Sequence, residues 1–153
     1  MVFNNARAGP RGANQVHAKG PTLNHHILVV DDDHSMRALL RRLLEGEGHT
    51  VETANDGDDA LDMFRPRHFS LVISDVVMPG CSGIELRDEL AERDPALPCV
   101  LVSGADIDGG LRYAASTYRT VFLAKPFEPD QLLRLVRSTP NPRDEDESRQ
   151  AAS

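Results

Sequence analysis

Short apolar runs and helical patterns alternate along most of this chain. The apolar runs are rich in β-branched residues and are bounded by Gly, Pro, Asn or Asp, which is typical of buried strands. They occur at residues 27–30, 50–54, 69–75, 99–102 and 120–124. Between and after these runs, apolar residues recur three and four positions apart, which predicts helices with one buried face. The pattern therefore predicts an α/β fold in which strands and helices alternate.

The helical patterns differ in strength. In the first and clearest one, Asp33 or Ser35 can cap the start, and the Gly-Glu-Gly run from Gly46 ends the helix. Its apolar residues share one face, namely Met36, Leu39, Leu40, Leu43 and Leu44. A weaker helix, interrupted by a Gly-Gly pair, is expected over residues 107–118. The last helix should begin at Pro129, because proline suits the first helical position.

Strict alternation of strands and helices favours a parallel sheet with helices on both faces. Right-handed crossovers leave few arrangements of such a sheet. The prediction is a doubly wound, five-stranded parallel sheet in the flavodoxin-like order 2-1-3-4-5. In that order the sheet opens a crevice between the first and third strands, beyond their carboxyl ends.

The two ends of the chain lack this periodicity. Residues 1–25 contain scattered Gly and Pro, three cations and no acids, which predicts a disordered N-terminal arm. Residues 139–153 contain two prolines and a dense run of charges, which predicts a disordered acidic tail. Residues 26–138 remain as one domain with a single core. No DNA-binding or enzymatic output domain is expected after it.

Composition and charge narrow the class of protein. The 153 residues are 40% hydrophobic, as in soluble globular proteins, and their net charge of −7 argues against a nucleic-acid- or membrane-binding basic face. There is no apolar stretch of membrane-spanning length and no secretory signal, so a cytoplasmic location is expected. Cys81 and Cys99 are too few for a disulfide framework. The six histidines have no consistent spacing and are expected at the surface.

The candidate chemistry lies at the strand ends. Asp31 and Asp32 follow the first strand and Asp75 ends the third, so the predicted strand order brings the three carboxylates to one crevice. Their mutual repulsion is relieved by a divalent cation, and a few oxygen ligands suit Mg²⁺. The fourth and fifth strands add Ser103 and Lys125. A metal ion, a hydroxyl and an ammonium around one carboxylate form a receptor for a phosphoryl group, with Asp75 as the nucleophile.

Over about residues 26–138 the chain resembles a receiver domain of two-component response regulators, of the chemotaxis-regulator kind. The matching motifs are Val29-Val30-Asp31-Asp32-Asp33, Asp75 with Met78-Pro79-Gly80 and Gly83, Ser103-Gly104, and Lys125-Pro126-Phe127. Each motif alone is weak evidence. Their occurrence in this order, each at the end of its own strand, is a specific signal.

The resemblance implies a role for each site residue. Asp75 accepts a phosphoryl group from a histidine kinase or histidine phosphotransfer protein. Mg²⁺ is held by Asp32, Asp75 and the main-chain carbonyl of Val77, with Asp31 acting through water. Lys125 pairs with the phosphoryl oxygen, and its peptide bond to the following proline is expected to be cis.

The resemblance also implies a switch. Ser103 moves to bind the phosphoryl group, and Phe122 turns into the space that it leaves. That change alters the face formed by the fourth helix, fifth strand and fifth helix, where a downstream protein binds. No direct DNA or membrane binding is expected. Val77 and Ala105 carry no polar group that could orient a hydrolytic water, so self-dephosphorylation is expected to be slow.

Two alternatives remain open on the sequence. Asp31-x-Asp33-x-Ser35 after the first strand is loosely similar to the nucleophile motif of haloacid-dehalogenase-type phosphohydrolases, with Asp31 as the nucleophile. A degenerate receiver that acts only as a scaffold is the other alternative. It is disfavoured because every phosphorylation residue type is present. The preferred hypothesis is a phosphoacceptor switch that at most catalyses its own phosphorylation and dephosphorylation.

Overall fold

A five-stranded parallel sheet forms the centre of the protein in a computed structural model that describes residues 24–104 and 119–152. Its strands are β1 (His26–Val30), β2 (Thr50–Ala54), β3 (Leu71–Asp75), β4 (Cys99–Ser103) and β5 (Thr120–Ala124). They lie in the order β2-β1-β3-β4-β5, and every pairing is parallel. The predicted fold class and strand order are confirmed.

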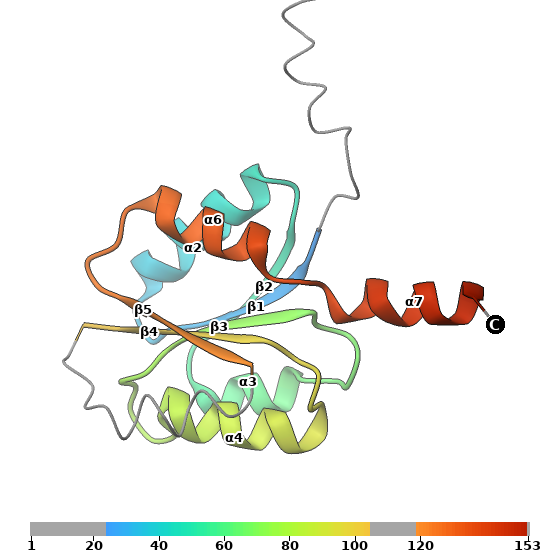
Figure 1. Ribbon diagram of the computed structural model, residues 1–153. Coiled ribbons are helices and arrows are strands. Elements are labelled where there is room, and N and C mark those ends of the chain that lie inside the picture. Colours follow the sequence, from blue (N-terminus) through green and yellow to red (C-terminus); the bar gives the residue numbers. More distant parts are fainter. Residues whose placement is uncertain (1–23, 105–118, 153) are drawn as a thin grey trace, which may run out of the picture.

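Helices cover both faces of the sheet (Figure 1). Helices α2 (His34–Gly46) and α6 (Pro129–Ser138) lie on one face, and α3 (Gly57–Met63) and α4 (Gly83–Arg93) lie on the other. Right-handed crossovers between parallel strands produce this two-sided arrangement. It leaves the carboxyl ends of all five strands at one edge of the sheet.

Side chains of β1 alternate between two hydrophobic clusters, one on each face of the sheet. Ile27 and Val29 pack on the side of α2 and α6, whereas Leu28 and Val30 pack on the side of α3 and α4. The helices contribute Leu40, Leu44, Leu132 and Val136 to the first cluster and Ala60, Leu86 and Leu90 to the second. Burying each of the leucine, isoleucine and valine side chains contributes about 1.5–3 kcal/mol. The clusters thereby fix the strand ends that carry the polar residues.

Side chains cap the N-termini of α2 and α4, which follow the carboxyl ends of β1 and β3. Asp33 caps α2 by accepting hydrogen bonds from the backbone N–H groups of Ser35 (2.9 Å) and Met36 (3.4 Å). Of the two caps that the sequence allowed, the structure therefore uses Asp33. Ser82 and Glu85 form a capping box at the start of α4. Such caps satisfy backbone donors that otherwise lack partners and contribute about 1 kcal/mol each.

The acidic segment after residue 139 differs from its prediction. In place of a disordered tail, residues Pro142–Ala152 form helix α7, which extends away from the sheet (Figure 1). Arg143 anchors its first turn by donating to Asp94 (2.5 Å) and to the carbonyl of Phe69 (2.8 Å), and Asn141 donates to the carbonyl of Asn24 (2.9 Å). The prediction was wrong because composition alone does not reveal these distant partners.

The expectation that the histidines lie at the surface is also corrected. His25 and His49 are buried, and the backbone N–H of His25 donates to Nδ1 of His49 (3.0 Å). His25 also contacts Ser70 and the carbonyl of Thr139, both at 2.9 Å. These polar partners offset the cost of removing imidazoles from water. His34, in contrast, is exposed.

Two of the predicted segments lie outside the described residues, namely most of the N-terminal arm and the helix expected over residues 107–118. Among the helices of the described ranges, none combines the length and the apolar character needed to cross a membrane.

Candidate phosphoacceptor and metal site

Three carboxylates meet at the carboxyl ends of β1 and β3. These strands are paired, with Val30 opposite Ser74, so that the residues after them are neighbours. Oxygen atoms of Asp31, Asp32 and Asp75 all lie within 4.8 Å of one another. Asp31 and Asp75 are buried, and Asp32 is exposed. The crevice predicted from the strand order therefore gathers these three acids, with one of them open to solvent.

The electrostatics of this cluster favour a cation. Burial raises the pKa of Asp31, and the neighbouring charges of Asp75 and Asp32 raise it further. A backbone hydrogen bond from Asp33 (2.8 Å) and the charge of Lys125 act in the opposite direction. Clustered carboxylate oxygens are the ligands of hard divalent ions. This set of carboxylate oxygens therefore fits a hard divalent ion such as Mg²⁺.

The positively charged side chain of Lys125 forms an ion pair with Asp75. Its Nζ lies 3.0 Å from Oδ2 of Asp75, and it follows directly after β5. Its backbone N–H donates to the carbonyl of Ser103 (2.8 Å), which fixes the start of the loop. The peptide bond from Lys125 to Pro126 is cis, as predicted. This loop brings an ammonium group from β5 to the end of β3.

The remaining predicted site residues lie on β4, on β5 and in the turn after β3. Ser103 ends β4 and is buried, and its strand pairs with both β3 and β5. Phe122 lies in β5 opposite Leu101 and packs, partly buried, against the cluster under α3 and α4. The backbone N–H of Val77 donates to Oδ1 of Asp75 (3.2 Å), and the Val77 side chain is 66% exposed. Ala105 lies outside the described residues.

Gly83 packs against the backbone of Asp75 and Val76, a role that sequence reasoning did not assign. A Cβ atom on this residue would overlap the carbonyl oxygen of Asp75 and lie 2.9 Å from Cα of Val76. The N–H of Gly83 also donates to the carbonyl of Val76 (2.9 Å). The first turn of α4 thus packs directly on the backbone of Asp75. The sequence matched Gly83 to the receiver-domain motifs without indicating this packing role.

Comparison with known proteins agrees with this geometry. The family described as "Response regulator receiver domain" matches residues 27–137. A similar curated protein is the uncharacterized transcriptional regulatory protein YkoG of Bacillus subtilis, 35% identical over 117 residues, which are 74% of this chain and 50% of YkoG. The transcriptional regulatory protein FixJ of Bradyrhizobium diazoefficiens is 37% identical over 118 residues, covering 76% of this chain and 57% of FixJ. The chain thus spans about half the length of these relatives.

Solved structures of similar fold include the chemotaxis protein CheY4 of Vibrio cholerae. That structure has a TM-score of 0.66 and 29% identity, and the match covers 76% of this chain and 98% of CheY4. A CheY-like receiver domain protein of Methanospirillum hungatei has a TM-score of 0.71 and 25% identity, with 82% and 98% of the two chains covered. The chain belongs to the receiver-domain family of two-component response regulators.

Proposed function

We propose that this protein accepts a phosphoryl group on Asp75 from a histidine kinase or histidine phosphotransfer protein. The observation that carries the proposal is the position of the Asp75 carboxylate between the Lys125 ammonium, 3.0 Å away, and the carboxylates of Asp31 and Asp32. Family membership supports the same role. The haloacid-dehalogenase alternative gains no support from the family assignment.

The reaction forms one bond and breaks one. A carboxylate oxygen of Asp75 attacks phosphorus, and the bond from phosphorus to the donor imidazole nitrogen breaks, leaving an acyl phosphate and a neutral histidine after proton uptake. Bound Mg²⁺ would neutralise charge on the transferring group. Lys125 neutralises the charge that builds on the phosphoryl oxygens, because its ammonium already faces Asp75. Asp32, Asp75 and the main-chain carbonyl of Val77 are the proposed metal ligands, with Asp31 acting through water.

The phosphorylated state is proposed to be read through a protein surface. Ser103, buried at the end of β4, binds the new phosphoryl oxygen, and Phe122 on the adjacent strand moves further into the space beside it. That movement alters the surface over β5 and α6. A downstream protein that prefers the altered surface then stabilises it, since a ligand shifts a two-state equilibrium by its differential affinity.

The direct output is proposed to be a contact with another protein rather than with DNA. The protein is proposed to act in the cytoplasm, where a histidine kinase has access to ATP. The site itself carries a cluster of acids, which repels a phosphate backbone. Similar proteins bear the names of transcriptional regulators, but this chain spans about half of their length. The proposal therefore concerns the receiver domain and its partner proteins.

Incubation with Mg²⁺ and a small phosphodonor tests this proposal. We expect one phosphate per chain, stable in acid and labile in base, which Asp75→Asn abolishes. Asp58→Asn is the matched control, because Asp58 is an exposed aspartate on α3. Label that persists in Asp75→Asn would contradict the proposal. Continuous phosphate release that survives Asp75→Asn but fails in Asp31→Asn would indicate the phosphohydrolase instead.

A further inference from the structure

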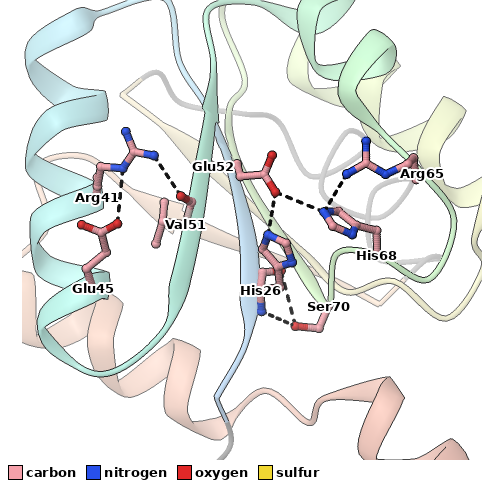
Figure 2. Close-up of polar contacts among 8 residues, drawn as sticks. All are labelled: His26, Arg41, Glu45, Val51, Glu52, Arg65, His68 and Ser70. Atoms are coloured by element: carbon pink, nitrogen blue, oxygen red, sulfur yellow. Dashed lines mark hydrogen bonds and ion pairs between the residues drawn. The ribbon is translucent and has the colours of Figure 1, made fainter.

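A second group of metal-ligating side chains lies at the opposite end of β1 from the three aspartates. It consists of His26, Glu52 and His68 (Figure 2). One ring nitrogen of each histidine and one oxygen of Glu52 lie within 4.8 Å of one another. The side chains are partly exposed: His26 by 26%, Glu52 by 37% and His68 by 31%. The group is therefore accessible from solvent and separate from the phosphoacceptor site.

The sheet register explains why these residues meet. Glu52 pairs with Leu28, and His26 lies two residues before Leu28, so the two polar side chains share one face of the sheet. His68 comes from the loop between α3 and β3, and its ring lies edge-on to that of His26, with centroids 4.3 Å apart. Both rings also lie against Phe69, at 4.9 and 4.7 Å. The aromatic contacts hold the two imidazoles in place beside the carboxylate.

Both histidines contact the same oxygen of Glu52 through Nε2. The distances to Oε2 are 2.6 Å from His26 and 3.1 Å from His68. Burial works to raise the pKa of Glu52, but the hydrogen bonds from His68 and His26 outweigh it, so the pKa is lowered. The two imidazole nitrogens therefore converge on one carboxylate oxygen.

The environment of His68 shows a conflict that a cation would remove. Nε2 of His68 lies 3.1 Å from the Glu52 oxygen, where it must donate, and 3.0 Å from the Arg65 guanidinium, where it must accept. A single ring nitrogen cannot do both in one protonation state. Arg65 is exposed, so its side chain can turn away into solvent. In the tautomer with the proton on Nδ1, the Nε2 lone pair of His68 can then bind a metal ion in place of the hydrogen bond to Glu52.

We propose that His26, Glu52 and His68 bind a divalent transition-metal ion, with Zn²⁺ as the preferred ion. Two imidazoles and one carboxylate form a known three-ligand set for zinc, and the fourth position is left to water. Tetrahedral ligands about 2.0–2.1 Å from zinc lie about 3.3–3.4 Å apart. The 3.1 Å separation of His68 and Glu52 is near this value, and the His26 contact lengthens by a small rotation of its side chain.

The ion joins three segments that are distant in the sequence. These are the start of β1, the middle of β2 and the loop before β3. An ion that binds only the folded state stabilises it by mass action. A free-ion concentration of about 100 times Kd adds about 2.7 kcal/mol to the free energy of unfolding. The site thus couples folding to zinc concentration, independently of Asp75 phosphorylation.

Zinc binding to the whole chain tests the proposal. Titration calorimetry with Zn²⁺ in millimolar Mg²⁺, which occupies the aspartate cluster, should give one site per chain. Co²⁺ should give the visible absorption of a tetrahedral nitrogen and oxygen site. Replacing any one of the three ligands should weaken zinc binding by more than about tenfold, which is the lower end of the loss caused by removing an outer-shell partner. The variants are His26→Gln, Glu52→Gln and His68→Gln.

Variants outside the cluster serve as matched controls. His34→Gln removes an exposed histidine on α2, and Asp75→Asn alters the phosphoacceptor site; both should leave zinc affinity unchanged. Arg65→Gln should tighten binding, because it removes a positive charge and a competing donor from His68. If His68 had only a structural role, Arg65→Gln would not increase the affinity for zinc. Circular dichroism checks that each variant is folded, and phosphorylation of Asp75 provides a second check for every variant except Asp75→Asn.

Three results would overturn the proposal. The first is the absence of zinc binding when Zn²⁺ is in molar excess over the chain. The second is binding that Asp75→Asn abolishes, which would place the ion at the aspartate cluster. The third is binding that the His26 and His68 variants leave unchanged. Since the readouts are binding and absorption, failure here leaves the phosphoacceptor proposal intact.

Discussion

The ammonium of Lys125 lies 3.0 Å from Oδ2 of Asp75, although 50 residues separate them in the sequence. The contact closes the site between β3 and β5, with β4 between these strands. The Asp75 side chain is 11% exposed and that of Lys125 is 29% exposed, so solvent screens the pair only in part. We therefore expect Lys125 to compete with a bound metal ion for the Asp75 carboxylate.

We expect Lys125→Met to change two properties in opposite directions. Mg²⁺ should bind more tightly, because a competing positive charge on Asp75 is lost. Phosphorylation by a small phosphodonor should slow by about a hundredfold, as on removal of one electrostatic partner of a transition state. Fluorescent-probe titration with Mg²⁺ and phosphate incorporation measure the two effects. Equal phosphorylation rates in the two proteins would contradict the role given to Lys125.

We expect Asp32→Asn to remove most of the stabilisation that Mg²⁺ gives to the fold. For the unchanged protein, free Mg²⁺ at about 100 Kd should add about 2.7 kcal/mol to the free energy of unfolding. Without the metal, the variant should be at least as stable as the unchanged protein, since Asp32 helps to raise the pKa of Asp31 by repulsion. Urea unfolding with Mg²⁺ and with a chelator measures both. A full Mg²⁺ response in the variant would exclude Asp32 as a ligand.

We expect Gly83→Ala to destabilise the protein by about 1–3 kcal/mol, because the new methyl group meets the fixed backbone of Asp75 and Val76. Gly46→Ala at the end of α2 is the matched control. Nothing lies within 4 Å of its added Cβ, so this change should be neutral or stabilise by about 0.4–1 kcal/mol. Denaturant unfolding compares the two. Equal effects at both positions would show that the close packing under Asp75 is unimportant.

The sheet and the residues at its strand ends were predictable because their signals are local. Each strand is a short apolar run, and Asp31, Asp75 and Lys125 directly follow or end such a run. Strand order then follows from few allowed topologies. These rules suffice to gather the acidic residues and the lysine at one edge.

The features that sequence reasoning missed depend on contacts between distant segments. His26, Glu52 and His68 meet only because of the register of β1 with β2 and the path of one loop. Helix α7 is anchored by Arg143 to Asp94, 49 residues earlier. Neither relationship leaves a periodic or spaced pattern in the chain. A charged tail and scattered histidines therefore resemble ordinary surface residues until the structure is known.

The buried pair of His25 and His49 should make stability depend on pH. Burial lowers the pKa of His49 below its usual value of 6.5, His25 lowers it further, and Glu47 opposes the shift. Burial likewise lowers the pKa of His25, against hydrogen bonds to Thr139 and Ser70 and the charge of Asp144. The unfolded chain then binds more protons than the fold. The contribution of the two neutral histidines to the free energy of unfolding is fully present above pH 6.5 and is lost as the pH falls below that value.

We expect His49→Asn to reduce this loss. The amide oxygen of asparagine can accept the hydrogen bond that His25 N–H now donates to Nδ1 of His49, and it does not titrate. The variant should lose less stability than the unchanged protein between about pH 7 and pH 5.5, because only His25 still takes up a proton on unfolding. His34→Asn, at an exposed position, should retain the full dependence. Urea unfolding at both pH values measures the slopes, and identical slopes in all three proteins would show that His49 does not contribute to the pH dependence of stability.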